Sequence, residues 1–259
     1  MTRTPRAARI VGVVSPALTL AGMIATPLLR RGSTARRTLS SVVVGGLFAT
    51  TAAAATHRWG APRTVAAAGT VAAATTAVEH VGARTGLPFG SYAYTGALRP
   101  TVAGVPAIVP LAWFAMAVPA RETAHAALGA RSNRATRIVV GAAALTAWDL
   151  FLDPQMVGEG FWRWARAGRY RGIPLSNFAG WLLTAAGVMA VLEVVLPPTP
   201  QPDPVLVGEY GVMATMETIG FARFFGDRVV AAVGGAGMLP VAATATARML
   251  GRQRRAHRV

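Results

Sequence analysis

Residues 178–196 read FAGWLLTAAGVMAVLEVVL and are followed by Pro197 and Pro198. A helix needs about 20 apolar residues to cross a hydrocarbon core about 30 Å thick, and this segment has that length and character. Two successive prolines cannot continue a helix, because they lack the backbone N–H and clash with the preceding turn. The segment therefore predicts a transmembrane helix that ends at Leu196.

Apolar segments of similar length recur along the rest of the chain, at 9–29, 39–56, 64–82, 103–120, 136–153 and 228–247. A further segment, 205–222, is apolar enough to enter the bilayer but carries two glutamates. We therefore expect an all-α, polytopic transmembrane helix bundle of about seven spans, with 205–222 as an open eighth. Segment 9–29 lacks a clean small-residue cleavage site, so we expect an uncleaved helix and no secretory signal peptide. Residues 1–259 should form one multi-pass domain in the cell (plasma) membrane.

Composition supports a membrane location. The chain is 53% hydrophobic and 14% charged, with a mean hydropathy of +0.43, whereas soluble domains carry about 25% charged residues. The net charge of +16 comes entirely from arginines that flank the apolar segments, which predicts contact with membrane lipids and no binding of nucleic acid. Without lysine the chain cannot hold retinal or pyridoxal phosphate as a Schiff base. Without cysteine it has no thiol nucleophile or thiolate metal site.

Three carboxyl groups lie near the ends of predicted spans. Glu79 is near the end of the third span, and Asp149 and Asp153 are near the end of the fifth. The two aspartates are four residues apart and share a helix face. The two span ends are two crossings apart, so they lie on the same side of the membrane. An acid at lipid depth normally faces the bundle interior, where a protonated carboxyl can act as a general acid. The alternative is that the three form ion pairs with Arg84, Arg163 or Arg171.

Aromatic side chains crowd the same two parts of the chain, and the candidates for a binding site are Phe89, Tyr92, Tyr94, Trp148, Trp162 and Trp181. Their π faces stabilise cations, although Trp and Tyr also gather at membrane interfaces, which we expect for Trp164 and Tyr170. His80 is a candidate proton shuttle, with a structural hydrogen bond as the alternative. The histidines are scattered without ligand spacing, so we predict no metal site.

These residues also form a recognisable pattern. It runs Glu79-x-x-Gly82-x-x-Thr85-Gly86-x-Pro88-Phe89-Gly90-x-Tyr92-x-Tyr94, then Pro106, Pro110, Trp113, Asp149 and Asp153-Pro154. It ends with Trp162-x-Trp164 and Tyr170-x-Gly172-x-Pro174-x-x-Asn177-Phe178-x-Gly180-Trp181. The chain resembles the membrane carotenoid-biosynthesis family of carotenoid 1,2-hydratases, which includes the bisanhydrobacterioruberin hydratases. The resemblance covers about residues 75–196.

The resemblance implies an enzyme that adds water across the terminal double bond of an acyclic carotenoid end, on a C40 or C50 substrate. Protonation at C2 gives a tertiary carbocation at C1, and water captures it, so no redox cofactor or metal is implied. Our hypothesis takes Asp149 or Asp153 as the acid and Glu79 as the group that holds the water. Trp148, Trp162, Tyr92 and Tyr94 would line the cation site, and Asn177 would orient the water or a carboxylate. Other membrane enzymes of the carotenoid pathway are further candidate partners.

Two other functions fit parts of the sequence. A non-catalytic membrane scaffold that binds carotenoids or isoprenoids would keep the aromatic residues and would not need the acids. A transporter would use intramembrane acids as a proton relay, but the chain shows no pair of broken, mirror-placed helices.

Overall fold

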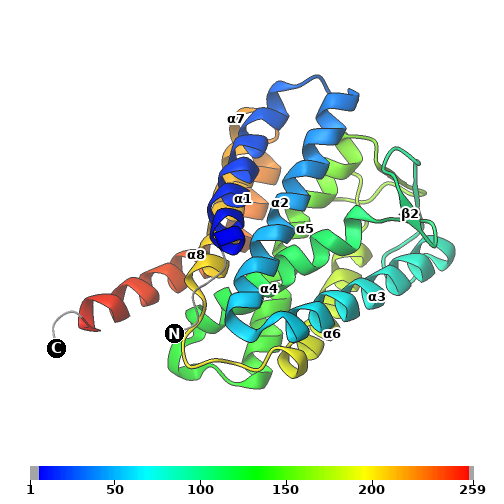
Figure 1. The fold of residues 1–259 in the computed structure, drawn as a ribbon. Coiled ribbons are helices and arrows are strands. Elements are labelled where there is room, and N and C mark those ends of the chain that lie inside the picture. Colours follow the sequence, from blue (N-terminus) through cyan, green and yellow to red (C-terminus); the bar gives the residue numbers. More distant parts are fainter. Residues whose placement is uncertain (1–5, 257–259) are drawn as a thin grey trace.

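The computed structural model describes residues 6–256 and is a bundle of α-helices (Figure 1). Within the described residues the eight α-helices are α1 (Arg6–Ala25), α2 (Thr34–Trp59), α3 (Ala61–Thr85), α4 (Ile108–Leu128), α5 (Arg134–Gly158), α6 (Leu175–Val195), α7 (Pro204–Arg223) and α8 (Arg228–Ala256). Short 3₁₀ turns, η1 (Thr26–Leu28) and η2 (Gly129–Arg131), follow α1 and α4. The prediction of an all-α bundle is confirmed, and the open segment 205–222 forms helix α7.

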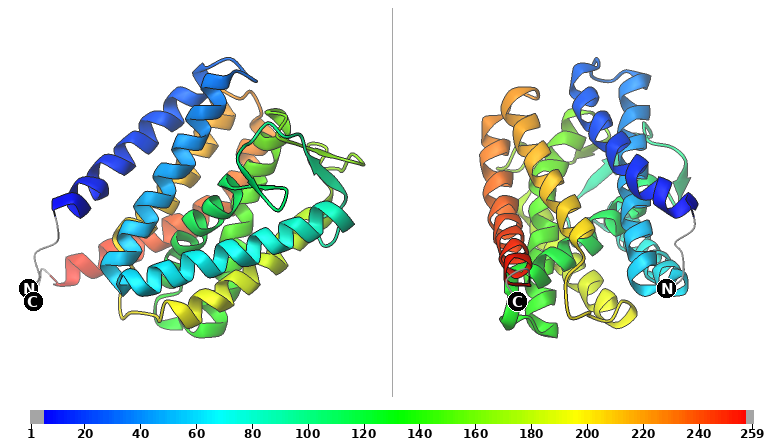
Figure 2. Two further views of the ribbon diagram at one scale, coloured as in Figure 1. Left: turned by 45° about the vertical axis from the view of Figure 1, so that its right-hand side comes forward. Right: turned by 60° about the vertical axis from the view of Figure 1, so that its left-hand side comes forward.

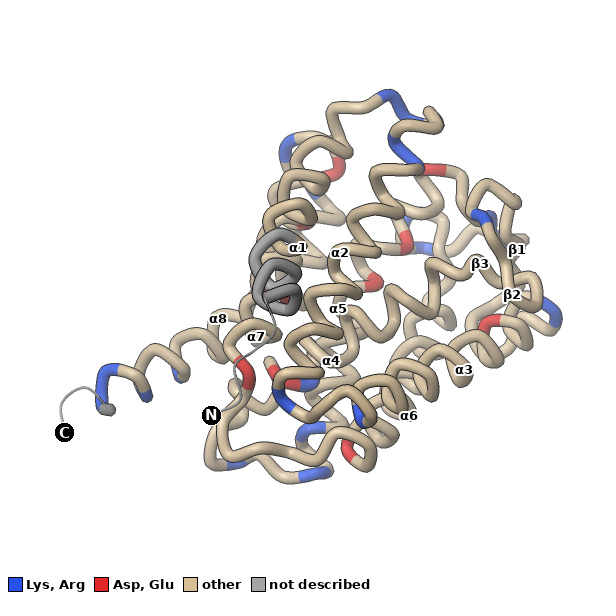
Figure 3. Tube along the Cα trace, viewed as in Figure 1, with Lys and Arg blue, Asp and Glu red and all other residues tan. Residues whose placement is uncertain are grey.

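Among the described residues, α2, α5, α6 and α8 are long and apolar enough to cross a membrane by length and composition. The number of spans therefore stays a prediction. Arginines gather at helix ends and in the connecting segments (Figure 3), as expected for groups held near headgroups.

Helix α4 lies at the centre of the bundle. It contacts α2, α3, α5, α6, α7 and α8, and its residues 113–124 are all buried. A helix that is apolar on every face is stable only when other helices surround it. Helices α1 and α2 pack together on one side, α7 and α8 on another, and α3 runs beside α6 along an edge (Figure 2).

Four of the described helices, α1, α4, α5 and α8, continue through a proline. In α4 and α5 a side chain satisfies the carbonyl that the proline leaves without a donor. We expected the fifth span to end at residue 153, but α5 continues through Pro154 to Gly158. The freed carbonyl of Leu150 accepts a hydrogen bond from the Tyr170 hydroxyl at 2.8 Å. Burial, together with the Asp227 carboxylate, raises the pKa of Tyr170 to about 12, so that hydroxyl remains a donor.

The second case is Pro119 in α4, which leaves the carbonyl of Ala115 without its helical donor. The Thr51 hydroxyl lies 2.9 Å from this oxygen and 2.8 Å from Oε2 of Glu209 on α7. A hydroxyl has one hydrogen to donate. If Thr51 donates it to the carbonyl, the Glu209 carboxyl must be protonated and must donate to Thr51. This contact joins α2, α4 and α7 inside the bundle.

The sequence placed Arg121 at the end of the fourth span, and this was wrong. Helix α4 extends to Leu128, and the Arg121 side chain is 1% exposed. Its Nε lies 2.7 Å from Glu193 on α6, and its Nη1 lies 3.2 Å from Glu122. Arg137 on α5 contacts the other oxygen of Glu193 at 2.5 Å. Buried charges are tolerated when they are paired, so these four residues join α4, α5 and α6 at one end of the bundle.

The two long connections form short β structure at the other end of the bundle. Strand β1 (Tyr92–Tyr94) pairs antiparallel with β4 (Trp162–Trp164). Strand β2 (Thr101–Val102) pairs with β3 (Val105–Pro106), so the first residues of the predicted span 103–120 belong to this hairpin and helix α4 begins at Ile108. The β1–β4 pairing confirms that the connections after α3 and α5 meet on the same side.

Candidate active site

A cavity lies between α2, α4 and α5 and is closed at its inner end by α3, α6 and β4. The empty space between its lining residues is about 760 Å³, including the part that is open to the outside. We call it the main cavity. Its lining is mostly apolar and includes Trp113, Trp148, Trp162 and Trp181. Glu79, Asp149 and Asp153 also line it, so the structure brings together the three carboxyl groups that the sequence singled out.

A smaller recess of about 200 Å³ adjoins the main cavity. Both spaces are lined by Glu79, Asp153, Trp162 and Trp181, while Asp149 lines only the main cavity. The recess is completed by Tyr92, Tyr94, Trp164 and Asn177. We call it the polar recess, because its walls carry carboxyl, hydroxyl, amide and indole N–H groups. An apolar space thus adjoins a small polar one, with two of the carboxyl groups at the boundary.

Glu79 is held by two tyrosines from strand β1. Tyr92 and Tyr94 both donate their hydroxyl hydrogens to Oε2 of Glu79, Tyr94 at 2.8 Å. Burial and the adjacent Glu79 carboxylate raise the pKa of both tyrosines, so both stay protonated and continue to donate. Hydrogen bonds donated to a carboxylate favour its ionised form. The two tyrosines therefore stabilise Glu79 as a base.

The two aspartates on α5 have different surroundings. Asp153 is 1% exposed and accepts a hydrogen bond from the Nδ2 of Asn177 at the start of α6. Asp149 is 6% exposed and, among the described residues, receives no hydrogen bond. A buried carboxyl without a donor, next to a second carboxyl, favours its neutral form. Asp149 is thus the member of the pair that is better placed to carry a proton.

The alternative of ion pairs with the loop arginines is wrong. Among residues 15–255, whose side chains the structure describes, the ion pairs join Arg36 to Glu159, Arg121 to Glu122 and Glu193, Arg137 to Glu193, and Arg171 to Asp227. None of them includes Glu79, Asp149 or Asp153. His80 Nδ1 donates to the carbonyl of Ala103 in the β2–β3 hairpin at 2.7 Å, so it has the structural role that we gave as its alternative. In the described part of the chain no three His, Asp or Glu side chains converge as metal ligands would.

Successive side chains of β1 and β4 alternate between the two faces of the strands, and the aromatic residues all lie on the inner face. Tyr92 pairs with Trp164 and Tyr94 with Trp162, whereas the Ala93–Arg163 pair between them is exposed. Alternate residues of a strand point to opposite faces, so all four aromatic rings lie on the inner face. Their ring centroids are 5.3 Å apart for Tyr92 and Trp164 and 6.0 Å for Tyr94 and Trp162.

Several indole N–H groups around the site have no partner. Nε1 of Trp148, Trp162 and Trp164 is buried and without a hydrogen-bond acceptor in the described protein, and so is the acceptor Oδ1 of Asn177. Buried polar groups normally have a partner, which is often water. Since three of these four residues line the polar recess, the recess has the donors and acceptors to hold water.

Phe89 does not line either space, which corrects our prediction that it contacts substrate. Its ring lies 4.2 Å from the ring of Trp181 and fits between α3 and α6. A Cβ added to Gly82 would come within 2.6 Å of the Phe89 ring, and one added to Gly180 would lie 2.8 Å from it and 3.0 Å from the backbone of Pro88. The two glycines and Phe89 therefore bring α3 and α6 close together and support Trp181. Tyr92 and Tyr94 also differ from our prediction, since they hold Glu79 in the polar recess and do not line the main cavity.

The sequence analysis missed several residues of the site. Trp164, which we assigned to the membrane interface, packs on Tyr92 and lines the polar recess. Its alternation with Trp162 was the available signal. Trp113 on α4 stacks 4.9 Å from Trp181. Ser40, Ser41 and Val44 on α2 line the main cavity as well, but no local pattern marks them, because their position depends on how α2 packs.

The fold and this site define a polytopic helical membrane protein with buried acids at the end of an apolar cavity. The carotenoid biosynthesis protein family matches residues 38–249, and the chain belongs to that family. The chain is also similar to a bisanhydrobacterioruberin hydratase of Haloarcula japonica, with 38% identity over 117 residues. That alignment covers 44% of this chain and 39% of the relative, so it spans less than half of either. No solved structure matches the chain significantly.

Proposed function

We propose that the protein hydrates the terminal double bond of an acyclic carotenoid end and gives a tertiary alcohol. The observation that carries this proposal is the adjacency of an apolar, tryptophan-lined cavity to a polar recess, with Asp149 facing the first and Glu79 facing both. Family membership and the hydratase relative support the same reaction class. The proposed location is the cell membrane, where the carotenoid is dissolved.

The first step is proton transfer to carbon. The terminal alkene lies in the main cavity, and the Asp149 carboxyl gives its proton to C2 as the π electrons form the new C–H bond. The positive charge then rests on C1 as a tertiary cation. The faces of Trp148, Trp162 and Trp181 stabilise that cation, since aromatic rings attract positive charge. In this mechanism Asp153, which accepts a hydrogen bond from Asn177, is ionised and adds a negative charge on the same side.

The second step is capture by water. A water molecule in the polar recess is oriented by Asn177 Oδ1 and the free indole N–H groups, and its oxygen attacks C1. Glu79 takes the proton that the water loses, and this proton returns to Asp149 to complete the cycle. The net change is one alkene plus one water to one alcohol. The residues at the site supply acid, base and cation stabilisation, which are the groups that this reaction needs.

Pigment analysis tests the proposal. The chain is expressed in a host that makes lycopene, and the carotenoids are analysed for a gain of the mass of one water. Asp149→Asn and Glu79→Gln should each abolish the product, because amides of the same shape neither donate a proton to carbon nor accept one from water. Asp227→Asn is the matched control, since Asp227 caps α8 on the surface and Asn caps helices equally well. Normal hydration by both site variants would refute the mechanism.

The alternative of a non-catalytic carotenoid-binding scaffold predicts a different outcome of the same experiment. The wild-type protein would then purify with bound pigment and form no hydrated product, and the amide variants would retain that pigment. The buried acids favour the enzyme, because a site that only binds a hydrocarbon gains nothing from three carboxyl groups that are costly to bury.

A further inference from the structure

A second cavity continues from the main cavity toward the surface of the bundle. It lies between α1, α2, α5 and α7 and has about 1030 Å³ of empty space, including the part that is open to the outside. We call it the outer cavity. Its lining shares five residues with the main cavity, namely Ser40, Val44, Trp148, Leu152 and Met156. These residues come from facing sides of α2 and α5. The two cavities are therefore neighbours across one common wall, with the acids at the far end of the main cavity.

The outer cavity reaches an exposed apolar part of the surface. Ile24, Ile219 and Phe224 line it and are 52%, 46% and 55% exposed. Ile24 lies on α1, Ile219 on α7 and Phe224 directly after α7, and both helices lie at the periphery of the bundle (Figure 2). Large apolar side chains with this exposure would be stable against acyl chains, so an apolar molecule could enter here from a bilayer.

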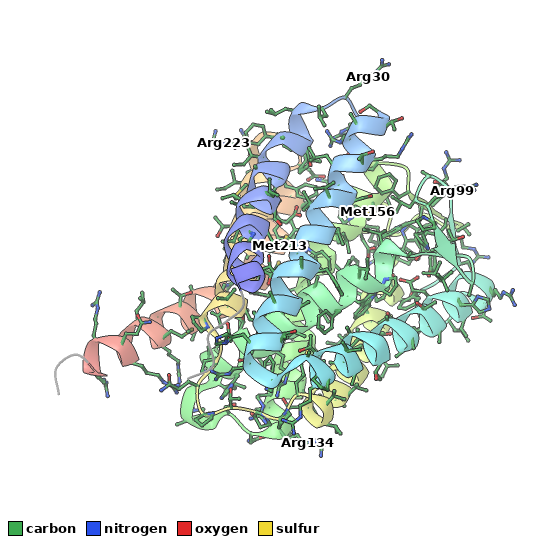
Figure 4. All side chains as sticks on the ribbon, in the orientation of Figure 1. Arg30, Arg99, Arg134, Met156, Met213 and Arg223 are labelled. Atoms are coloured by element: carbon green, nitrogen blue, oxygen red, sulfur yellow. The ribbon has the colours of Figure 1, made fainter. Side chains whose placement is uncertain are left out.

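The walls of the outer cavity suit a hydrocarbon. Four methionines line it, Met23, Met156, Met213 and Met216, of which Met156 and Met213 are labelled in Figure 4. Methionine is unbranched and adapts to irregular apolar shapes. The hydroxyls of Thr26 and Ser40 donate within their own helix segments, to Gly22 O at 2.7 Å and Arg36 O at 3.0 Å, so they offer no free hydrogen. Gln155 and Glu217 are the other polar groups of this wall.

We propose that the outer cavity holds the polyene chain of the carotenoid, so that the molecule enters between α1 and α7 and passes the wall formed by α2 and α5 to place one end at the acids. This inference rests on the proposed function. Val44 sets the width of the passage, because it lines both cavities and comes from α2, opposite Leu152 and Met156 of α5. Val44 would then decide whether a long substrate reaches the acids.

A groove between α3 and α6 is the alternative place where a substrate could enter. It is apolar and partly exposed, and its lining includes Val191 and Leu183. This groove shares no lining residue with the main cavity or the polar recess. Close packing of Phe89 with Gly180 separates it from the site. The groove therefore provides a matched control surface, where the same substitution should have no effect on substrate entry.

The test compares a long and a short substrate that carry the same terminal alkene, lycopene and β-farnesene. Val44→Phe and, independently, Met216→Trp should lower hydration of lycopene by about tenfold or more, because overpacking the wall excludes the chain. Met216→Trp should hydrate β-farnesene within about twofold of wild type, since Met216 lines the outer cavity and not the main cavity. Val44 lines both cavities, so Val44→Phe is compared with wild type on lycopene alone. Val191→Phe should leave both rates unchanged. Lycopene that co-purifies with each detergent-solubilised variant provides a second readout, which does not depend on catalysis.

The outcomes separate this inference from the proposed function. If wild type hydrates neither substrate, the proposed function fails, and reduced co-purification of lycopene with Val44→Phe and Met216→Trp would still support the route. Hydration of lycopene at the wild-type rate by both Val44→Phe and Met216→Trp would overturn the route. A selective loss of lycopene hydration in Val191→Phe would also overturn it, and would assign entry to the α3–α6 groove. Loss of hydration of both substrates by Met216→Trp, with normal binding of lycopene, would equally contradict it.

Discussion

The two tyrosines on Glu79 make a quantitative prediction. In the proposed reaction Glu79 acts as a carboxylate, and its Oε2 accepts hydrogen bonds from both Tyr92 and Tyr94. Tyr94→Phe removes one of the two donors and keeps the ring, which packs edge-to-face on Trp162 at 6.0 Å. A hydrogen bond to a charged group contributes about 1.5–3 kcal/mol. The lost bond favours the carboxylate over the protonated acid, and about 1.4 kcal/mol corresponds to a factor of ten. The ionised fraction of Glu79, and with it the rate of hydration, should therefore fall by up to about 10–100-fold.

The assay is the initial rate of lycopene hydration by purified protein in detergent, at substrate concentrations that separate kcat from KM. The loss should fall on kcat, because Tyr94 does not line the main cavity where the alkene lies. Tyr210→Phe is the matched control. It removes a buried hydroxyl that donates to Ala144 O at 2.8 Å, outside the site, and it should lower stability without changing kcat. Unchanged kcat in a Tyr92→Phe, Tyr94→Phe double variant would refute the role of the tyrosines.

Three further predictions concern the packing that holds the site. Gly180→Ala should destabilise the protein by about 1–3 kcal/mol, because the new Cβ would lie 3.0 Å from the backbone of Pro88. Thermal unfolding in detergent measures this loss, and an unchanged Tm would contradict the close packing. Thr51→Val should cost about 1–3 kcal/mol by leaving the Ala115 carbonyl without a donor, while Thr51→Ser should keep most of the stability; equal Tm values for the two variants would count against that bond. Glu193→Ala should cost about 3–5 kcal/mol, because it leaves two buried arginines without their shared partner; a shift in Tm no larger than that of an exposed surface substitution would exclude a stabilising role for this network.

The sequence predicted best those residues of the site that recur at short intervals along one helix or strand. Asp149 and Asp153, four residues apart, were expected on one helix face, and both line the main cavity. Glu79 was expected at the same side as this pair, and it lies across the same cavity. The alternation of Trp162 with Trp164 was visible, but only Trp162 was assigned to the site and Trp164 was assigned to the membrane interface. The pairing of β1 with β4 shows that both rings face inward.

Helix ends were predicted less well. The predicted fourth span, 103–120, ended at the charged Arg121, and the predicted fifth span, 136–153, stopped before Pro154. In the structure Arg121 is paired with two buried glutamates, and the carbonyl freed by Pro154 is satisfied by Tyr170. Both compensating groups lie far away in the chain, so no local window of sequence contains them.

The sequence by itself determined that this chain forms a helical membrane bundle, because the length and polarity of each segment decide whether it is stable in lipid. It also singled out the ionisable groups that are costly to bury at lipid depth. Only the tertiary structure decided that Asp149 is without a donor while Glu79 has two, and that Val44 of α2 lies in the wall between two cavities. These distinctions depend on contacts between helices that are remote in the chain, and those contacts exist only after the helices have packed.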